Sequence, residues 1–185
     1  MENEAKDSLI VLAFHIGQGD PFCGSVYIRS GFYSGSMGMP TTECDGILPR
    51  AGAYPYATYR ADFNTRKVVA IPLKIGLGGS SYAASSKSGT VKVHITNTTG
   101  NAITGTMYIV LVETNIAYSG STFYNVVRDM FPYTSGKSVS IPANGSLDEM
   151  EAFFIGPSCN TSNCSIVVFI QGSSKEVYQV ARYKW

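Results

Sequence analysis

The hydrophobic pattern of the chain changes near residue 72. Before this point, apolar residues form a continuous run at Leu9–Ile16, which predicts a strand covered on both faces. Aromatic residues at helical spacing make Tyr54–Lys67 the best helix candidate, and Pro55 suits the first turn of such a helix. We expect a further short helix around Val26–Tyr33 and a short strand between two turns within Met37–Gly46.

After residue 72, apolar and polar residues alternate in short runs that are separated by turn signals. This pattern predicts an antiparallel, immunoglobulin-like β-sandwich. The stretch Gly78–Ser88 is rich in Gly and Ser and is expected to be an irregular connection. The prediction is therefore an α+β, mostly β fold with a region at 1–72 and a β-sandwich at 73–185. The strand candidates are residues 91–96, 105–113, 123–130, 137–141, 147–155, 165–171 and 177–184.

Composition and charge exclude several classes of protein. Charged residues are 15% of the chain and the formal net charge is +1, so an electrostatic grip on nucleic acid or on an anionic membrane is not expected. The hydrophobic content of 44% is too high for a disordered chain. No apolar run reaches about 18 residues, so we expect no membrane-spanning helix.

Four cysteines are spaced widely along the chain. An even count fits two disulfides, although four cysteines allow three pairings. Cys159 and Cys164 are predicted to close a small loop, which leaves Cys23 to pair with Cys44. A zinc site is the alternative, but it needs closer cysteine spacing or histidine partners, so we expect no metal and no cofactor. Disulfides would place the chain outside the reducing cytosol.

The first residues of the chain and its sequons bear on the cellular location of the protein. The start of the chain is polar and charged, unlike a signal peptide, so export requires a signal that lies upstream; a cytoplasmic protein is the alternative. We favour an extracellular or cell-surface location. The four Asn-X-Ser/Thr sequons are candidate glycosylation sites and begin at Asn97, Asn144, Asn160 and Asn163.

The two histidines and one charged pair are candidates for chemistry. His15 can be a base, but a half-buried ring held by a hydrogen bond is the favoured interpretation. His94 alternates with apolar neighbours and is expected to face solvent. Arg128 and Asp129 are expected to form an ion pair, either buried at a sheet edge or exposed and weak.

Other motifs indicate no catalytic site. The stretch Gly76–Ser81 contains glycines but lacks the Lys-Ser/Thr of a phosphate-binding loop. No Gly-X-Ser-X-Gly motif is present, so a hydrolase nucleophile is not expected. A group of acidic residues beside a turn is interpreted as a solvated face rather than a cation site. These acidic residues are Asp148, Glu149 and Glu151.

Several segments together resemble a known arrangement of domains. One set resembles the later part of a thioredoxin-like domain and consists of Asp20-Pro-Phe22, Arg29, Phe32-Tyr33, Gly38-Met-Pro-Thr41, Asp45-Gly46 and Tyr56–Arg60. A second set resembles the β-sandwich that follows such a domain in certain bacterial secreted or outer-surface proteins. It consists of Gly89–Val93, Asn97–Gly100, Glu113, Val126–Pro132 and Ile166–Gln171. The resemblance implies a cis-proline at Pro40.

The chain departs from this family at the place where the chemistry would occur. A thioredoxin-like enzyme carries Cys-X-X-Cys at the start of a helix that precedes the strand matched here by Leu9–Ile16. Neither Cys23 nor Cys44 belongs to a Cys-X-X-Cys pair. The low pKa of the family's nucleophile depends on that helix. The resemblance therefore implies a partial thioredoxin-like fold without redox activity.

The function expected from these observations is that of a non-catalytic, exported structural protein. An incomplete sheet leaves an open edge and apolar surface beside Leu9–Ile16, and both require a cover. Self-association supplies such a cover, for example in an extracellular filament. The alternatives are a fragment of a thiol-disulfide oxidoreductase whose Cys-X-X-Cys lies upstream, and a surface module that binds peptide or glycan.

Overall fold

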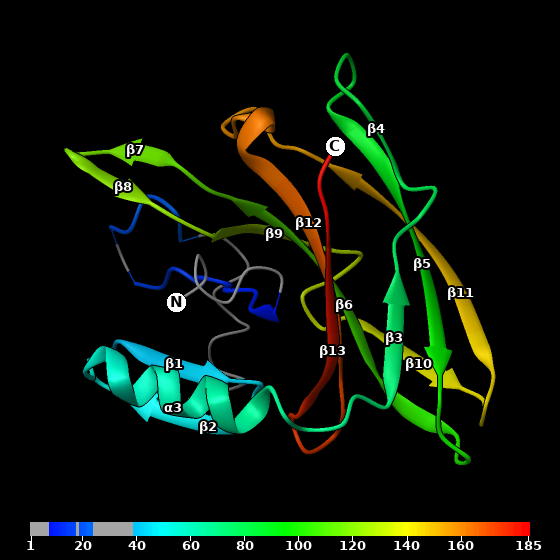
Figure 1. Cartoon of the computed structure of the whole chain (residues 1–185). Helices are drawn as coiled ribbons and strands as arrows, with labels where there is room; N and C mark the ends of the chain where they lie inside the picture. Colours follow the sequence, from blue (N-terminus) through cyan, green and yellow to red (C-terminus); the bar gives the residue numbers. More distant parts are fainter. Residues whose placement is uncertain (1–7, 18, 24–38) are drawn as a thin grey trace.

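The computed structural model describes residues 8–17, 19–23 and 39–185. The chain is mostly β, with antiparallel sheets, and the prediction of a mostly β fold is confirmed. Figure 1 shows the hairpin β1–β2 and helix α3 on one side of a larger pair of sheets. The short helix predicted around Val26–Tyr33 lies outside the described residues.

Two antiparallel sheets form the larger part of the molecule. The first contains β10 (Lys137–Ile141), β6 (Ile103–Glu113), β12 (Cys164–Gln171) and β13 (Val177–Tyr183) in that order, and β9 (Val126–Phe131) also pairs with β6. The second contains β11 (Ser146–Phe154), β5 (Ser88–Asn97) and β3 (Leu73–Gly76) in that order, and β4 (Ser81–Ala83) pairs with β5.

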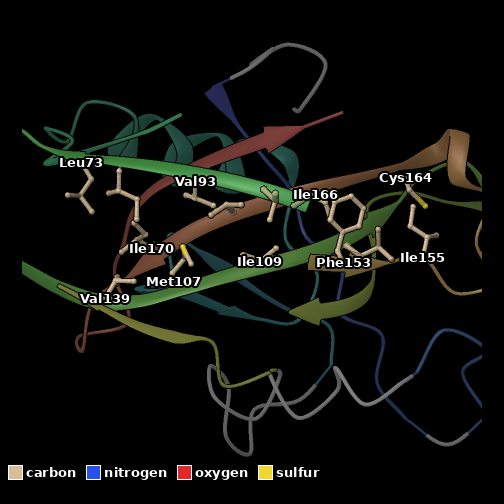
Figure 2. Close-up of a cluster of buried hydrophobic side chains, with 14 of the residues drawn as sticks. Leu73, Val93, Met107, Ile109, Val139, Phe153, Ile155, Cys164, Ile166 and Ile170 are labelled. Carbon is tan, nitrogen blue, oxygen red and sulfur yellow. The ribbon is translucent and has the colours of Figure 1, made fainter. Parts of the chain in front are cut away.

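The core lies between these two sheets and follows from the alternation in the sequence. Side chains such as Val93 from β5, Ile109 from β6 and Ile166 from β12 point into the same space and are almost fully buried (Figure 2). Because successive residues of a strand face opposite sides, one face of each sheet supplies this core.

The opposite face of the first sheet carries a second apolar cluster. Tyr108 and Val110 from β6 and Val167 and Phe169 from β12 lie in it, between the residues that face the core. Segment Leu9–Phe14 covers part of this cluster through Ile10, Leu12 and Phe14. The sheet is thus apolar on both faces, which explains why β6 and β12 read as nearly continuous hydrophobic runs.

One predicted connection and one predicted strand differ from the structure. Gly78–Ser88 was expected to be irregular, but it holds β4, which pairs with the start of β5. Gly89 permits this close pairing, because a Cβ atom there would lie 2.2 Å from the Ser81 carbonyl oxygen. The strand predicted at 123–130 is divided in two, because Asn125 has a positive φ of 56°. β8 (Ser121–Phe123) therefore pairs with β7 (Ile116–Tyr118), and β9 begins afresh.

The region before β3 contains a hairpin and a helix. Hairpin β1 (Thr41–Cys44) and β2 (Leu48–Ala51) turns at Asp45 and Gly46, which both have positive φ. Helix α3 spans Tyr56–Arg66, within two residues of its predicted bounds. It buries Asp62 and Phe63.

The strand predicted at Leu9–Ile16 is not formed. Its backbone pairs at Ala13 alone, where the N–H donates to the Asn125 carbonyl (2.8 Å) and the carbonyl accepts from Val127 (2.9 Å). None of its residues is fully buried. A continuous apolar run indicates that a segment is buried, but it does not show that the segment pairs as a strand. Here the segment contacts the sandwich mainly through its side chains.

The two regions meet where the β1–β2 turn docks onto the β12–β13 turn. The Val177 N–H donates to the Asp45 carbonyl (2.9 Å). Arg66 at the end of α3 bonds Asp45 (3.0 Å) on one side and Glu176 on the other. At Gly46 the contact is so close that a Cβ atom would lie 2.1 Å from the Lys175 carbonyl oxygen.

Candidate functional site

A groove runs between the N-terminal region and the outer face of the sandwich, with a volume of about 680 Å³. One wall is Leu9–Phe14 and the other is formed by residues 39–46 and one face of α3. Its floor is the outer apolar cluster, at Phe169, Val177 and Val180. We call this feature the apolar groove.

Apolar side chains remain accessible along the groove. Val11 is 39% exposed, Met39 at the opposite wall is 56% exposed, and Tyr56 at the start of α3 is 50% exposed. An exposed apolar surface of this kind is typical of a site that contacts another protein.

The lining of the groove includes an ion-paired carboxylate, at Asp62, and a thiol, at Cys44. Arg50 donates twice to the Asp62 carboxylate, at 2.8 and 3.0 Å, and this hydrogen bonding lowers the pKa of Asp62. Burial raises the pKa of Glu43. Burial also raises the pKa of the Cys44 thiol to about 11, so this thiol is protonated at neutral pH. The described lining of the groove therefore suits an apolar segment, and the Cys44 thiol in it is not activated.

Pro40 lies in the wall of the groove, and the Met39–Pro40 peptide bond is cis. The resemblance to a thioredoxin-like domain predicts a cis-proline at this position. A second cis bond, Phe131–Pro132, follows β9 and was not anticipated.

The cysteines are free thiols, so the two predicted disulfides are absent from the structure. Cys44 lies in β1 at the groove, and Cys23 closes the turn that follows Asp20. Cys159 and Cys164 are close together at the ends of one loop, as their spacing suggested, but they contact each other as hydrogen-bonded thiols.

Neither histidine lines the groove. His15 Nδ1 lies 2.8 Å from Asp20 Oδ2, and its ring packs edge-on against Phe22 and Phe123. This is the half-buried, hydrogen-bonded ring that the sequence favoured. His94 is on the solvent face of β5, as predicted, where Nδ1 lies 2.7 Å from Asp148 Oδ1.

The predicted ion pair between neighbours in β9 is wrong. Arg128 pairs with Glu113 of β6 (3.4 Å), whereas Asp129 accepts from the backbone N–H of Met130 (2.8 Å). Arg128 is the extra residue at a register shift between β9 and β6, where the regular alternation of the strand is interrupted. The acidic group lies within β11, and its Glu149 pairs with Lys137 of the other sheet.

The candidate glycosylation sites have different surroundings. Asn97 is buried, and its side-chain amide nitrogen donates to the carbonyls of Asn101 (2.8 Å) and Pro142 (2.9 Å), which leaves no room for a glycan. Asn144 and Asn160 are exposed, and Asn163 is partly exposed.

Comparison with known proteins gives a likeness of fold. No family model matches the chain, and no curated protein matches its sequence. The structure is similar to that of HBP35 of Porphyromonas gingivalis, with a TM-score of 0.68 and 13% identity. The alignment covers 86% of this chain and 57% of HBP35, so the chain spans little more than half the length of that protein.

Two further solved structures show weaker similarity. A domain of the outer membrane lipoprotein Omp28 from Porphyromonas gingivalis has a TM-score of 0.46 and 18% identity, over 63% of this chain and 90% of that one. A β-glucosidase from Kluyveromyces marxianus has a TM-score of 0.37 and 10% identity, over 62% of this chain and 14% of that one. Among the described residues, no helix is long and apolar enough to cross a membrane.

Proposed function

We propose that this chain is a non-catalytic structural protein of the bacterial cell surface, and that it self-associates through the apolar groove. The groove carries the proposal, because Val11 and Met39 line it, are partly exposed, and lie in walls on either side of an apolar floor. The similarity of its fold to a protein of Porphyromonas gingivalis supports a bacterial origin. The low charge and the wealth of hydroxyl side chains suit an extracellular surface.

The chain itself offers a segment that suits the groove. Residues 68–71 join α3 to β3, and the side chains of Val68 and Ile71 are 76% and 57% exposed. Val69 beside them is also exposed. A short, uncharged, apolar segment of this kind is the complement of an apolar groove. We infer that Val68–Ile71 of one copy lies in the groove of the next.

Such a contact joins two different surfaces of the molecule. An interface of this type is heterologous, and it continues into a filament unless its rotation closes a ring. The proposal of an extracellular filament subunit rests on this geometry. A monomer that stays a monomer at every concentration tested would contradict it.

The experiment uses complementary variants of the full chain. Val11→Lys together with Met39→Lys places charges in the groove, and Val68→Lys together with Ile71→Lys places charges on the segment. Each variant alone is expected to be monomeric by light scattering coupled to size-exclusion chromatography. Mixed together, they are expected to form a dimer, because one copy keeps its groove and the other its segment.

The control carries a matched charge elsewhere. Met150 is 64% exposed in β11 and does not line the groove, so Met150→Lys is expected to associate as the parent chain does. If the groove variant disrupts assembly but the segment variant does not, the groove takes another part of the neighbouring copy, and the inference about Val68–Ile71 fails. If neither variant matters, the proposed function fails.

We also infer that region 1–72 is a partial thioredoxin-like fold and that residues 73–185 form an immunoglobulin-like sandwich. The order of hairpin β1–β2 followed by α3 supports the first assignment, and the two facing antiparallel sheets support the second. An experimental structure of the chain superposed on members of both folds tests these assignments.

A further inference from the structure

Two cysteines flank the loop that joins β11 to β12. Cys159 is 9% exposed and Cys164 is 1% exposed, and a short 3-10 turn at Thr161–Asn163 separates them. The Asn160 side-chain oxygen accepts a hydrogen bond from the Ser162 backbone N–H (3.2 Å), and the Asn160 backbone N–H donates to Glu113 Oε1 (2.8 Å). The loop is therefore held in one conformation, with both thiols at its base.

The two sulfur atoms are in hydrogen-bond contact. The Cys164 thiol also lies 3.3 Å from the Asn160 carbonyl oxygen, so its one proton has two acceptors within reach. Ionised Cys159 is the stronger acceptor of the two, because hydrogen bonds to charged groups are stronger. Hydrogen bonding from Cys164, aided by the charge of Arg128, lowers the pKa of Cys159 to about 7. The same contact and burial raise the pKa of Cys164.

A bulge in β9 brings a cation to this pair. The register between β9 and β6 shifts at Arg128, which is the extra residue. Its guanidinium donates to Ser158 Oγ (3.1 Å) and to the Cys159 sulfur, and its Nε lies 3.4 Å from Glu113 Oε2. Only 14% of the Arg128 side chain and 5% of the Glu113 side chain are exposed. A fixed positive charge thus faces Cys159, and a buried carboxylate faces that charge.

We propose that Cys159 and Cys164 form a redox pair that closes into a disulfide by exchange with an external disulfide, with Cys159 as the attacking thiol. The Cys159 thiolate attacks one sulfur of the external disulfide, whose S–S bond breaks as one thiolate leaves. The Cys164 sulfur then attacks the Cys159 sulfur and releases the second external thiolate. The two protons lost by the pair pass to the two released thiolates, so the external disulfide is reduced as the pair is oxidised.

The order of attack follows from the difference between the two thiols. Exchange is carried out by the thiolate form, which Cys159 populates at neutral pH and Cys164 does not. Access favours the same order, because exposed Ser158 and Asn160 adjoin Cys159, whereas Cys164 begins the buried strand β12. Cys164 is therefore the resolving thiol. This inference is independent of the apolar groove.

The experiment uses the full chain with Cys23→Ser and Cys44→Ser, so that two thiols remain. The folded protein is incubated with oxidised glutathione, quenched in acid, and its remaining thiols are alkylated and counted by intact mass. Both thiols are expected to disappear together, with a loss of two hydrogens and no retained glutathione. Retention of both thiols in the folded protein, or a lasting glutathione adduct, would overturn the proposal.

Single variants test the assigned roles. In the same background, Cys164→Ser is expected to trap a mixed disulfide on Cys159, whereas Cys159→Ser is expected to leave Cys164 unreactive until the protein is unfolded in urea. Equal reactivity of the two folded variants would show that the order is wrong.

The cation is tested through the pH dependence. The rate of alkylation of Cys159 is expected to reach half its maximum near pH 7 in the parent background. Arg128→Gln is expected to move this midpoint to higher pH, and Arg128→Lys to move it less. Circular dichroism establishes that each variant is folded, and the lysine variant carries the test if the glutamine variant is not. An unchanged midpoint in a folded variant would remove Arg128 from the proposal.

Discussion

The sandwich and the N-terminal region are held together by different interactions. Between the sheets, side chains such as Ile95 and Ile166 are completely buried and belong to one continuous core. In the N-terminal region, the apolar run Leu9–Ile16 is nowhere fully buried, and the hairpin is fixed to the sandwich by Arg66 and by the backbone contact at Asp45. The comparison teaches that the hairpin and α3 are positioned by polar contacts, whereas Leu9–Phe14 packs on the sandwich through apolar side chains. The apolar groove lies between these two parts of the N-terminal region.

The largest expected effect tests the difference in burial. Ile166→Ala removes a side chain with no exposed surface from the core, and the expected loss of unfolding free energy is about 2–5 kcal/mol. Ile10→Ala removes the same atoms from a half-buried position, where the cavity opens to solvent, so we expect a loss of about 1 kcal/mol. Urea unfolding of both variants measures the difference.

Ile71→Ala is the matched control, because its side chain is 57% exposed and its truncation is expected to change stability little. Equal losses at Ile10 and Ile166 would mean that the run is buried as deeply as the core. That result would contradict the comparison.

The next effect concerns the contact between the two turns. Arg66→Gln removes the cation that bonds Asp45 and Glu176, and we expect a loss of about 1.5–3 kcal/mol from these charge-assisted hydrogen bonds. Amide hydrogen exchange is expected to quicken in β1 and β2 before it changes in β6. Lys74→Gln removes an equal charge from an exposed position of β3 and serves as the control. If amide exchange quickens equally in the hairpin and in the sandwich, the hairpin does not open independently of the sandwich, and the prediction is wrong.

The smallest effect concerns pH. Hydrogen bonding to Arg50 lowers the pKa of Asp62 in the folded chain, so this pair adds stability above the ordinary pKa of an aspartate. That stability is lost as the pH falls below about 4, through the folded pKa, and we expect it to be about 1 kcal/mol at most because Arg50 is partly exposed. Thermal unfolding at several pH values measures it.

Asp62→Asn is expected to flatten this part of the pH profile. Asp148→Asn, at a carboxylate that is 80% exposed on the sandwich, is expected to leave it in place. If both variants change the loss of stability at low pH equally, the Arg50–Asp62 pair is not the cause of that loss.

The predictability of the fold differs between the same two regions. In the sandwich, alternation located β10 at its observed bounds, because one face of each strand meets the core and the other meets solvent or a second cluster. Around Leu9–Ile16 the hydrophobic pattern indicates that the segment is at least partly buried, but it does not show whether the segment forms a strand. In the structure the segment contacts the sandwich through its side chains and forms no strand. Short β4 was missed, since its pairing depends on a close approach at Gly89.

The site was less predictable than the fold. The walls and floor of the groove come from the start of the chain, from the hairpin and from Val180 near the end, and no local pattern joins them. The pairing of Arg128 with Glu113 depends on a bulge, which has no clear signal in a run of apolar residues. Spacing alone did place Cys159 close to Cys164, because only four residues separate them in the connection that leads into β12.

The apolar outer face of the first sheet also determines whether the two regions are separable. A fragment that begins at Leu73 would contain both sheets and their shared core, yet Tyr108, Val110 and Phe169 would lose the cover that Leu9–Phe14 gives them. Such a fragment would expose a hydrophobic sheet surface and tend to aggregate. The segment Leu9–Phe14 therefore matters for the solubility of the sandwich, because its side chains cover part of the apolar outer face.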